Sequence, residues 1–247
     1  MLEIPPEENE ELKMSEKATT VVLVHGAFAD ASSWNEVVAD LTARGINVLA
    51  PANELSGIAR DGKRLAAQVR EIDGPVVLVG HSYGGAVITA AANDADNVTG
   101  LVYIAAFAPD EGETLGGLNE SFPATDFGAG LAPHNLPADG DDETWLSIAT
   151  DKFHALFAAD VPAAQADVMG RSQRPIAAAA FGEPAPAASW KRLPTHFLIA
   201  TGDQAIHPDG EREMAKRAGG TTIEVDASHA VSVSQPKAVA DFIASAL

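Results

Sequence analysis

The chain has 247 residues, of which 46% are hydrophobic and 21% charged, the balance of a soluble globular protein with a sizeable core. Its formal net charge of −19 argues against nucleic acid and anionic membrane surfaces as partners. The absence of cysteine excludes disulfides, thiolate metal ligands and a cysteine nucleophile.

The first 18 residues are rich in glutamate and contain Pro5-Pro6. We expect a flexible acidic tail at 1–18, with a surface helix over 7–17 as the alternative. The stretch has neither the basic n-region nor the apolar h-region of a signal peptide, and no apolar run in the chain is long enough to cross a bilayer. The sequence therefore predicts a cytoplasmic protein.

Short apolar runs rich in β-branched residues alternate with segments of helical periodicity between residues 19 and 109. This alternation predicts a parallel, right-handed, doubly wound sheet, and the length fits one large α/β domain. The expected strands are 19–24, 46–50, 76–79 and 98–107. The expected helices are 34–44, 60–72 and one that begins near residue 86.

The pattern breaks between residues 110 and 193, where glycine, proline and alanine are frequent and aromatic residues are scattered. A structureless loop of this length is improbable in a compact domain, so we expect an inserted cap, or lid, at 110–193. Within it, the alternating runs 145–149 and 153–157 predict a hairpin, and 162–171 predicts a short helix. The cap would lie beside the strand ends and could cover a pocket.

The strand and helix pattern resumes at residue 194. The expected strands are 195–200 and 221–225, and the expected helices are 208–217 and one from residue 236. The α/β core is therefore expected to comprise 19–109 and 194–247, with about six mostly parallel strands.

The motif Gly80-x-Ser82-x-Gly84 follows the strand expected at 76–79 and precedes a possible helix. A serine on such a sharp turn adopts a strained backbone conformation, and side chains at the flanking positions would clash with the strand or the helix. The turn exposes the serine Oγ at the tip of the sheet, near the N-terminus of the next helix. The motif therefore predicts Ser82 as a nucleophile.

Two further reactive side chains follow later strands: Asp203 follows 195–200, and His229 follows 221–225. Open α/β sheets place their sites at this edge, and the chain order Ser…Asp…His is the one expected for an elbow serine. His229 would accept the proton of Ser82, and Asp203 would orient the imidazole.

An oxyanion hole requires two backbone N–H donors. One is expected from Tyr83, the residue after the nucleophile. The other is expected from Ala27 or Phe28, in the loop after the first strand.

Other acidic residues are alternatives to Asp203. Asp110, Glu111 and Glu113 follow the fourth strand, where some hydrolases carry the acid, although we prefer to interpret them as a solvated hinge. Asp226 is nearer to the histidine in sequence, but we expect it to face solvent from a strand end.

The other histidines lack the spacing of metal ligands, so no metal site is expected. His25 is in a position where its ring would brace the oxyanion loop. His81, directly before the nucleophile, is expected to pack within the elbow.

Several of these stretches resemble the motifs of the α/β-hydrolase family. They are His25-Gly26, Gly80-His81-Ser82-Tyr83-Gly84-Gly85, Gly202-Asp203-Gln204-Ala205-Ile206-His207-Pro208 and Ser228-His229. The resemblance extends over residues 19–247 and is greatest to the subgroup of small bacterial esterases, plant methylesterases and hydroxynitrile lyases. It implies a six-stranded core, a cap between the fourth and fifth strands, and no cofactor.

The chain departs from the lyases of that subgroup at two places. Those lyases have a lysine directly after the catalytic histidine, where this chain has Ala230. The loop Ala27-Phe28-Ala29-Asp30 also lacks their threonine and cysteine. Both departures disfavour lyase chemistry.

The sequence thus predicts a serine hydrolase that cleaves small hydrophobic or aryl carboxylic esters through an acyl-enzyme. The residues expected to contact substrate are Phe28, Trp145, Phe127, Phe181 and His207, although the cap aromatics would equally suit a lid core. The same triad could instead open lactones, carry out perhydrolysis, lyase or cofactor-free oxygen chemistry, or belong to a slow-turnover receptor. A small-molecule ester is the expected partner, and both a monomer and a homodimer stay open.

Overall fold

The computed structural model describes residues 17–137 and 142–247. The tail expected at 1–18 lies outside these ranges, except for residues 17 and 18. The alternative surface helix at 7–17 also lies outside them, except for Lys17. Lys17 itself is an exposed residue whose Nζ lies 3.1 Å from Asp73 Oδ2. No helix in the described ranges is long and apolar enough to cross a membrane.

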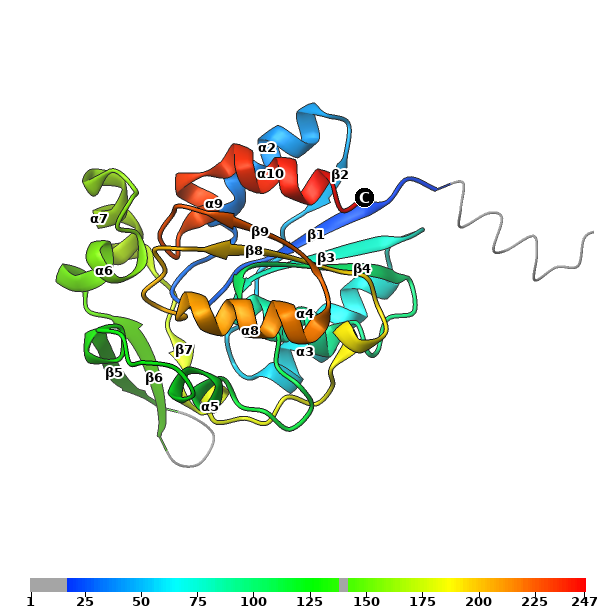
Figure 1. Ribbon diagram of the computed structural model, residues 1–247. Coiled ribbons are helices and arrows are strands. Elements are labelled where there is room, and N and C mark those ends of the chain that lie inside the picture. Colours follow the sequence, from blue (N-terminus) through cyan, green and yellow to red (C-terminus); the bar gives the residue numbers. More distant parts are fainter. Residues whose placement is uncertain (1–16, 138–141) are drawn as a thin grey trace, which may run out of the picture.

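A six-stranded, all-parallel sheet forms the centre of the molecule (Figure 1). Its strands, in spatial order, are β2 (Asn47–Leu49), β1 (Thr20–Val24), β3 (Val76–Ser82), β4 (Val98–Ala106), β8 (Thr195–Ala200) and β9 (Thr221–Val225). The predicted fold class is therefore confirmed, and β8 and β9 have the bounds that the sequence predicted.

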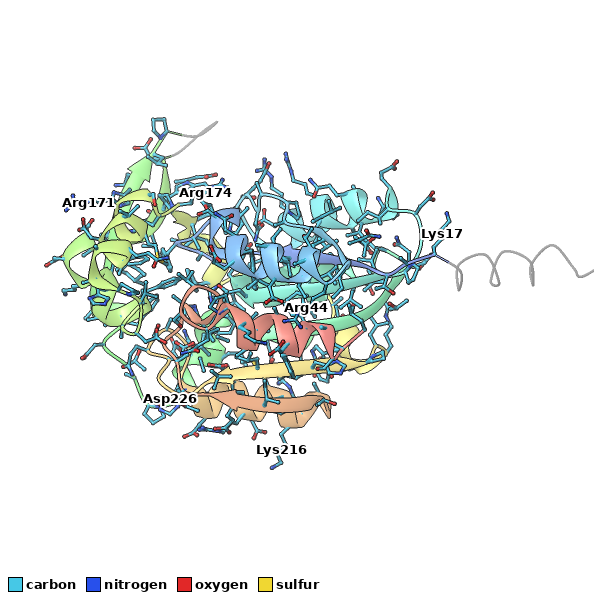
Figure 2. The ribbon with its side chains drawn as sticks, turned by 90° about the horizontal axis from the view of Figure 1, so that it is seen from above. Lys17, Arg44, Arg171, Arg174, Lys216 and Asp226 are labelled. Carbon is cyan, nitrogen blue, oxygen red and sulfur yellow. The ribbon has the colours of Figure 1, made fainter. Side chains whose placement is uncertain are left out.

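Helices cover both faces of this sheet (Figure 1). On one face lie η1 (Ala31–Trp34), α2 (Asn35–Ala43), α9 (Val231–Ser234) and α10 (Pro236–Ala244). On the other lie α3 (Ile58–Arg70), α4 (Tyr83–Ala91) and α8 (Pro208–Ala218). Arg44, at the end of α2, contacts Asp241 of α10 at 2.6 Å, so an ion pair joins the two helices at the surface (Figure 2).

The central strands are buried on both sides, which explains their continuous apolar sequences. Val22 and Val24 of β1 belong to the core between the sheet and α3, α4 and α8. Val21 and Leu23 belong to the second core, which includes the fully buried Trp34. Successive strand residues thus contribute to opposite layers.

The segment 110–193 connects β4 to β8. Its elements are α5 (Leu115–Glu120), η2 (Gly128–Gly130), β5 (Leu131–Leu136), β6 (Glu143–Ile148), α6 (Thr150–Phe157), α7 (Ala163–Ser172), β7 (Ile176–Ala177), η3 (Ala178–Phe181) and η4 (Ser189–Lys191). Of these, β5, β6, α6 and α7 lie beyond one end of the strands (Figure 1). The last part of the segment returns beneath the sheet, where Arg192 donates to the Ala92 carbonyl oxygen at the end of α4. The strands β5, β6 and β7 form a small antiparallel sheet. The short helix predicted at 162–171 is confirmed as α7.

The hairpin predicted from runs 145–149 and 153–157 is wrong. The first run is a strand, β6, but its partners are β5 and β7, whereas the second run is the helix α6. Phe153 and Phe157 are both buried, and a spacing of four residues fits one face of a strand and one face of a helix equally well. The periodicity of so short a run could not distinguish them.

Candidate active site

Ser82 stands at the junction between β3 and α4 in a strained backbone conformation, with φ 55° and ψ −124°. The flanking glycines are needed because other main chain lies against them. A Cβ at Gly80 would lie 2.5 Å from the Gly84 carbonyl oxygen, and a Cβ at Gly84 would lie 2.4 Å from the Val24 carbonyl oxygen. Real Cβ atoms do not lie so close to other atoms, so this backbone geometry requires glycine at both positions.

The loop after β1 also lies directly against the serine. A Cβ at Gly26 would be 2.6 Å from Ser82 Cβ and 2.9 Å from the His81 carbonyl oxygen. Only a glycine allows this loop to approach Ser82 so closely.

Asp203 and His229 form a buried pair. Asp203 Oδ2 lies 2.5 Å from His229 Nδ1, and both side chains are almost fully shielded from solvent, at 0% and 1% exposure. The other carboxylate oxygen, Oδ1, accepts hydrogen bonds from the backbone N–H groups of Ala205 at 2.6 Å and Ile206 at 3.0 Å. Both oxygens of the carboxylate therefore have partners, and the His229 ring is oriented with Nδ1 toward Asp203.

His81 connects the elbow to the histidine loop. Its Nε2 lies 2.9 Å from the His229 carbonyl oxygen, and the two imidazole rings are 4.7 Å apart. Because a carbonyl only accepts, Nε2 carries the proton. Burial, with the nearby His229 as a second cause, holds the pKa of His81 well below its usual value, so the ring is neutral. The residue before Ser82 thus binds the backbone of His229.

His25 braces the loop after β1. Its Nε2 accepts a hydrogen bond from the Asn53 backbone N–H at 2.9 Å, and its Nδ1 lies 2.9 Å from the Gly26 carbonyl oxygen. Burial lowers the pKa of His25. A neutral imidazole with one donor and one acceptor nitrogen satisfies both contacts.

The two candidate oxyanion donors in this loop differ in their contacts. The Phe28 backbone N–H donates to the Arg174 carbonyl oxygen at 3.1 Å. The Ala27 N–H has no backbone acceptor within the described ranges. Phe28 has a positive φ of 61°, which marks a sharp turn immediately after Ala27.

Tyr83 begins α4 and points into the core. Its hydroxyl donates to Asp61 Oδ2 at 2.8 Å, and Asp61 also accepts from the Ser56 hydroxyl at 2.6 Å. Burial, followed by the charge of Asp61, raises the pKa of Tyr83. The ring thereby anchors the first turn of α4, a role for Asp61 that the sequence did not indicate.

The histidine loop is also fastened to the segment 110–193. The Phe157 carbonyl oxygen accepts from the Ala230 backbone N–H at 2.9 Å, and the Phe157 ring meets the His229 ring edge-on at 4.9 Å. Asp160 Oδ1 accepts from the Ser228 hydroxyl. Sequence reasoning missed Phe157 and Asp160 as neighbours of the histidine because nothing local marks such long-range contacts.

The acids considered as alternatives to Asp203 pair with basic residues or are exposed to solvent. Asp110 lies 2.5 Å from Lys191 Nζ, and Glu113 lies 2.6 Å from Arg217. Asp226 is exposed at the surface (Figure 2). Only Asp203 among the acids considered contacts the His229 ring.

A cavity of about 560 Å³ opens between the segment 110–193 and the loop that carries Ala205 and His207. Ser82, Asp203 and His229 are not among the residues that line it. Of the residues expected to contact substrate, Phe127, Phe181 and His207 line it. Trp145 does not, but its neighbour Leu146 does, because successive residues of β6 point to opposite faces. Phe28 lies behind the wall, where its ring packs edge-on against Phe127 at 5.8 Å.

No group of three or more histidine or acidic side chains that could hold a metal ion occurs in the part of the chain that the structure describes. His207, at the cavity, instead caps α8: its Nδ1 accepts from the Asp209 backbone N–H at 3.2 Å. Its ring also stacks on Phe122, with the ring centroids 6.1 Å apart.

Comparisons with known proteins agree with this architecture. The model of the alpha/beta hydrolase family matches residues 21–242. The chain is 28% identical to a pyrethroid hydrolase of Sphingobium wenxiniae over 253 residues, which covers 92% of this chain and 86% of that protein. It is 36% identical to a carbendazim hydrolyzing esterase of Nocardioides over 107 residues, but that alignment covers only 38% of this chain and 44% of the relative.

Among solved structures, polyneuridine aldehyde esterase superposes with a TM-score of 0.80 at 18% sequence identity. The superposition covers 93% of this chain and 99% of the esterase. At this level of identity the likeness concerns the fold.

Proposed function

The chain belongs to the alpha/beta hydrolase family, and we propose that it is a serine esterase that cleaves small hydrophobic or aryl carboxylic esters. The observation that carries the proposal is the buried 2.5 Å contact between His229 Nδ1 and Asp203 Oδ2. Ser82 stands on a strained elbow directly after His81. The 2.9 Å bond from His81 to the His229 backbone keeps the elbow and the imidazole together.

In the proposed mechanism, Ser82 Oγ attacks the ester carbonyl carbon while His229 Nε2 accepts its proton. Asp203 keeps the proton of the neutral ring on Nδ1 and stabilises the imidazolium that forms. The imidazolium then protonates the leaving alcohol, which gives an acyl-enzyme on Ser82. A water molecule that His229 deprotonates hydrolyses this intermediate, which releases the carboxylic acid and returns a proton to Ser82.

The oxyanion would be held by the backbone N–H groups of Tyr83 and Ala27. The engagement of the Phe28 N–H by the Arg174 carbonyl oxygen supports Ala27 as the second donor. The Tyr83–Asp61 hydrogen bond at 2.8 Å would keep the first donor in place by fixing the start of α4.

The cavity supports the substrate class. Its volume of about 560 Å³ suits a small organic ester, and its walls are largely apolar, with Phe122, Leu131 and Leu146 among them. The names of the relatives, a pyrethroid hydrolase and a carbendazim hydrolyzing esterase, point in the same direction. We therefore propose a neutral, hydrophobic or aryl ester as the substrate.

The first test replaces the nucleophile. Ser82→Ala is expected to reduce kcat for p-nitrophenyl acetate by on the order of 10⁶-fold, as in other triad enzymes. Ser245→Ala, at the exposed C-terminal end of α10, serves as the control and should keep wild-type activity. Retention of activity in Ser82→Ala would refute the assignment.

A serine-directed aryl phosphonate gives a second test. Stoichiometric labelling of Ser82, located by peptide mass spectrometry, is expected for an enzyme. Labelling at another residue would mean that Ser82 is not the nucleophile. Absence of labelling, together with tight binding of the intact ester, would indicate a small-molecule receptor instead.

A further inference from the structure

Glu211 is a buried carboxyl group that the mechanism above does not use. It lies in the first turn of α8, and only 2% of its surface is exposed. A charged carboxylate in such a place loses its hydration, so burial requires either several hydrogen-bond donors or a proton.

The donors near Glu211 are few. Its Oε1 has no hydrogen-bond partner within the described ranges. Two groups favour the charged form, the backbone at Ala200 and, to a smaller extent, the charge of Arg212. Arg212 is occupied at the surface, where it contacts Glu224 at 2.8 Å and Asp209 at 2.7 Å.

Among charged groups, Asp203 has the strongest influence on Glu211. Both residues are buried, and the Asp203 backbone N–H donates to the Ala200 carbonyl oxygen at 3.2 Å, so both adjoin the end of β8. Two carboxyl groups this close share one proton, because the second negative charge would be repelled by the first. Burial, and then the charge of Asp203, raises the pKa of Glu211 well above its usual value.

The hydrogen-bond partners decide which carboxyl keeps the proton. Both oxygens of Asp203 have hydrogen-bond partners, namely Ala205 and Ile206 for Oδ1 and His229 for Oδ2, so Asp203 is the acceptor of the pair. Glu211 has no comparable set, and one of its oxygens has no partner at all within the described ranges.

We propose that Glu211 is a positioning residue: as a neutral carboxylic acid it donates a hydrogen bond to the Asp203 carboxylate and holds that carboxylate against His229. The inference rests on the proposed function. The proton stays on Glu211 throughout the reaction, so Asp203 remains an anion and the histidine remains the only base.

Three variants separate this role from a purely structural one. Glu211→Gln keeps a neutral donor of the same shape, and Glu211→Leu removes the donor. Glu213→Gln changes an exposed neighbour on the same helix and is the control. For each, kcat and KM for p-nitrophenyl acetate are measured across pH 5–9.

Glu211→Gln is expected to keep kcat within about 3-fold of wild type and to leave the apparent pKa of the kcat/KM profile unchanged, because one neutral donor replaces another. Glu211→Leu is expected to lower kcat about 10-fold at constant KM, the typical effect of losing a hydrogen bond to a charged group. A downward shift of the profile by half a pH unit or more in Glu211→Gln would mean that Glu211 is charged and would overturn the proposal. Unchanged kcat in Glu211→Leu would overturn its positioning role.

The infrared spectrum of the substrate-free protein tests the proton directly, whether or not Glu211→Leu folds. At pH 7 the wild type should show the carbonyl band of a buried protonated carboxylic acid, and Glu211→Gln should lose it. The band should persist in Ser82→Ala. If Ser82→Ala abolishes hydrolysis but the wild type lacks the band, this inference fails while the proposed function stands. If the wild type shows the band but does not hydrolyse esters, the proposed function fails while Glu211 is still shown to be protonated.

Discussion

The hydroxyl of Ser228 donates a hydrogen bond to the carboxylate of Asp160, although 68 residues separate them along the chain. Ser228 directly precedes the histidine of the proposed triad, and Asp160 follows α6. Together with the bond from the Ala230 N–H to the Phe157 carbonyl oxygen, this contact ties the histidine loop to the segment 110–193. The position of His229 therefore depends on residues that lie outside the α/β core.

A double-mutant cycle on this contact should show coupling. Ser228→Ala and Asp160→Ala should each lower the free energy of unfolding. Because each single variant loses the same hydrogen bond, the loss in the double variant should be about 1 kcal/mol smaller than the sum of the two single losses. Urea unfolding gives the energies, and kcat for p-nitrophenyl acetate should fall in parallel.

The exposed ion pair of Arg171 with Asp167 on α7 is the control cycle, for which coupling of at most about 0.5 kcal/mol is expected. Additive losses at Ser228 and Asp160 would show that the contact does not hold the loop.

Gly26→Ala should damage catalysis more than stability. The added Cβ would lie 2.6 Å from Ser82 Cβ, so the serine or the loop after β1 must move. A displacement of this size costs roughly 100-fold in kcat when reacting groups must be aligned. Gly182→Ala is the matched control, because its Cβ would meet only the Ala179 carbonyl oxygen, at 3.9 Å. Wild-type kcat in Gly26→Ala would contradict the tight approach of the two loops.

The fold was predicted well where a short stretch of sequence shows the pattern of an element, such as an apolar run between turn residues. The strands β8 and β9 are short β-branched runs bounded by proline, glycine or charged residues, and their predicted ends agree with the structure. The strained turn at Ser82 was predictable for the same reason, since its flanking glycines are required by close approaches of the backbone.

The parts that failed depend on packing between elements, which a short stretch of sequence does not show. The helix α6 was mistaken for a strand because Phe153 and Phe157 fit either period, and only packing on α7 and on the histidine loop makes it a helix. Glu211 looks in sequence like any solvated glutamate of a charged helix. Its burial behind Asp203 follows from how α8 packs on the sheet, which no local pattern reveals.

Leu146→Trp should narrow substrate selection. The larger side chain would project into the cavity of about 560 Å³ from β6. We expect kcat/KM for p-nitrophenyl octanoate to fall about 10-fold relative to the acetate, since a hydrophobic pocket discriminates by volume. Trp145→Phe, one residue away on the opposite face of the strand, should leave the ratio unchanged. An equal loss for both esters in Leu146→Trp would place the acyl chain elsewhere.

The buried acid behind Asp203 should also make stability depend on pH. Because the pKa of Glu211 is raised in the folded protein above its ordinary value of 4.5, the folded state keeps a proton that the unfolded state has already released. Its contribution to stability is fully present below pH 4.5 and is lost as the pH rises toward the folded pKa. Glu211→Gln has no such titration.

The free energy of unfolding of Glu211→Gln, minus that of the wild type, should therefore be constant below about pH 4 and should increase at higher pH, by up to ~1.4 kcal/mol per pH unit for one proton. Urea unfolding from pH 4 to pH 8 measures this difference, and Glu213→Gln should parallel the wild type throughout. A difference that stays constant over the whole range would mean that Glu211 ionises alike in the folded and unfolded chains, and that Asp203 has no protonated neighbour.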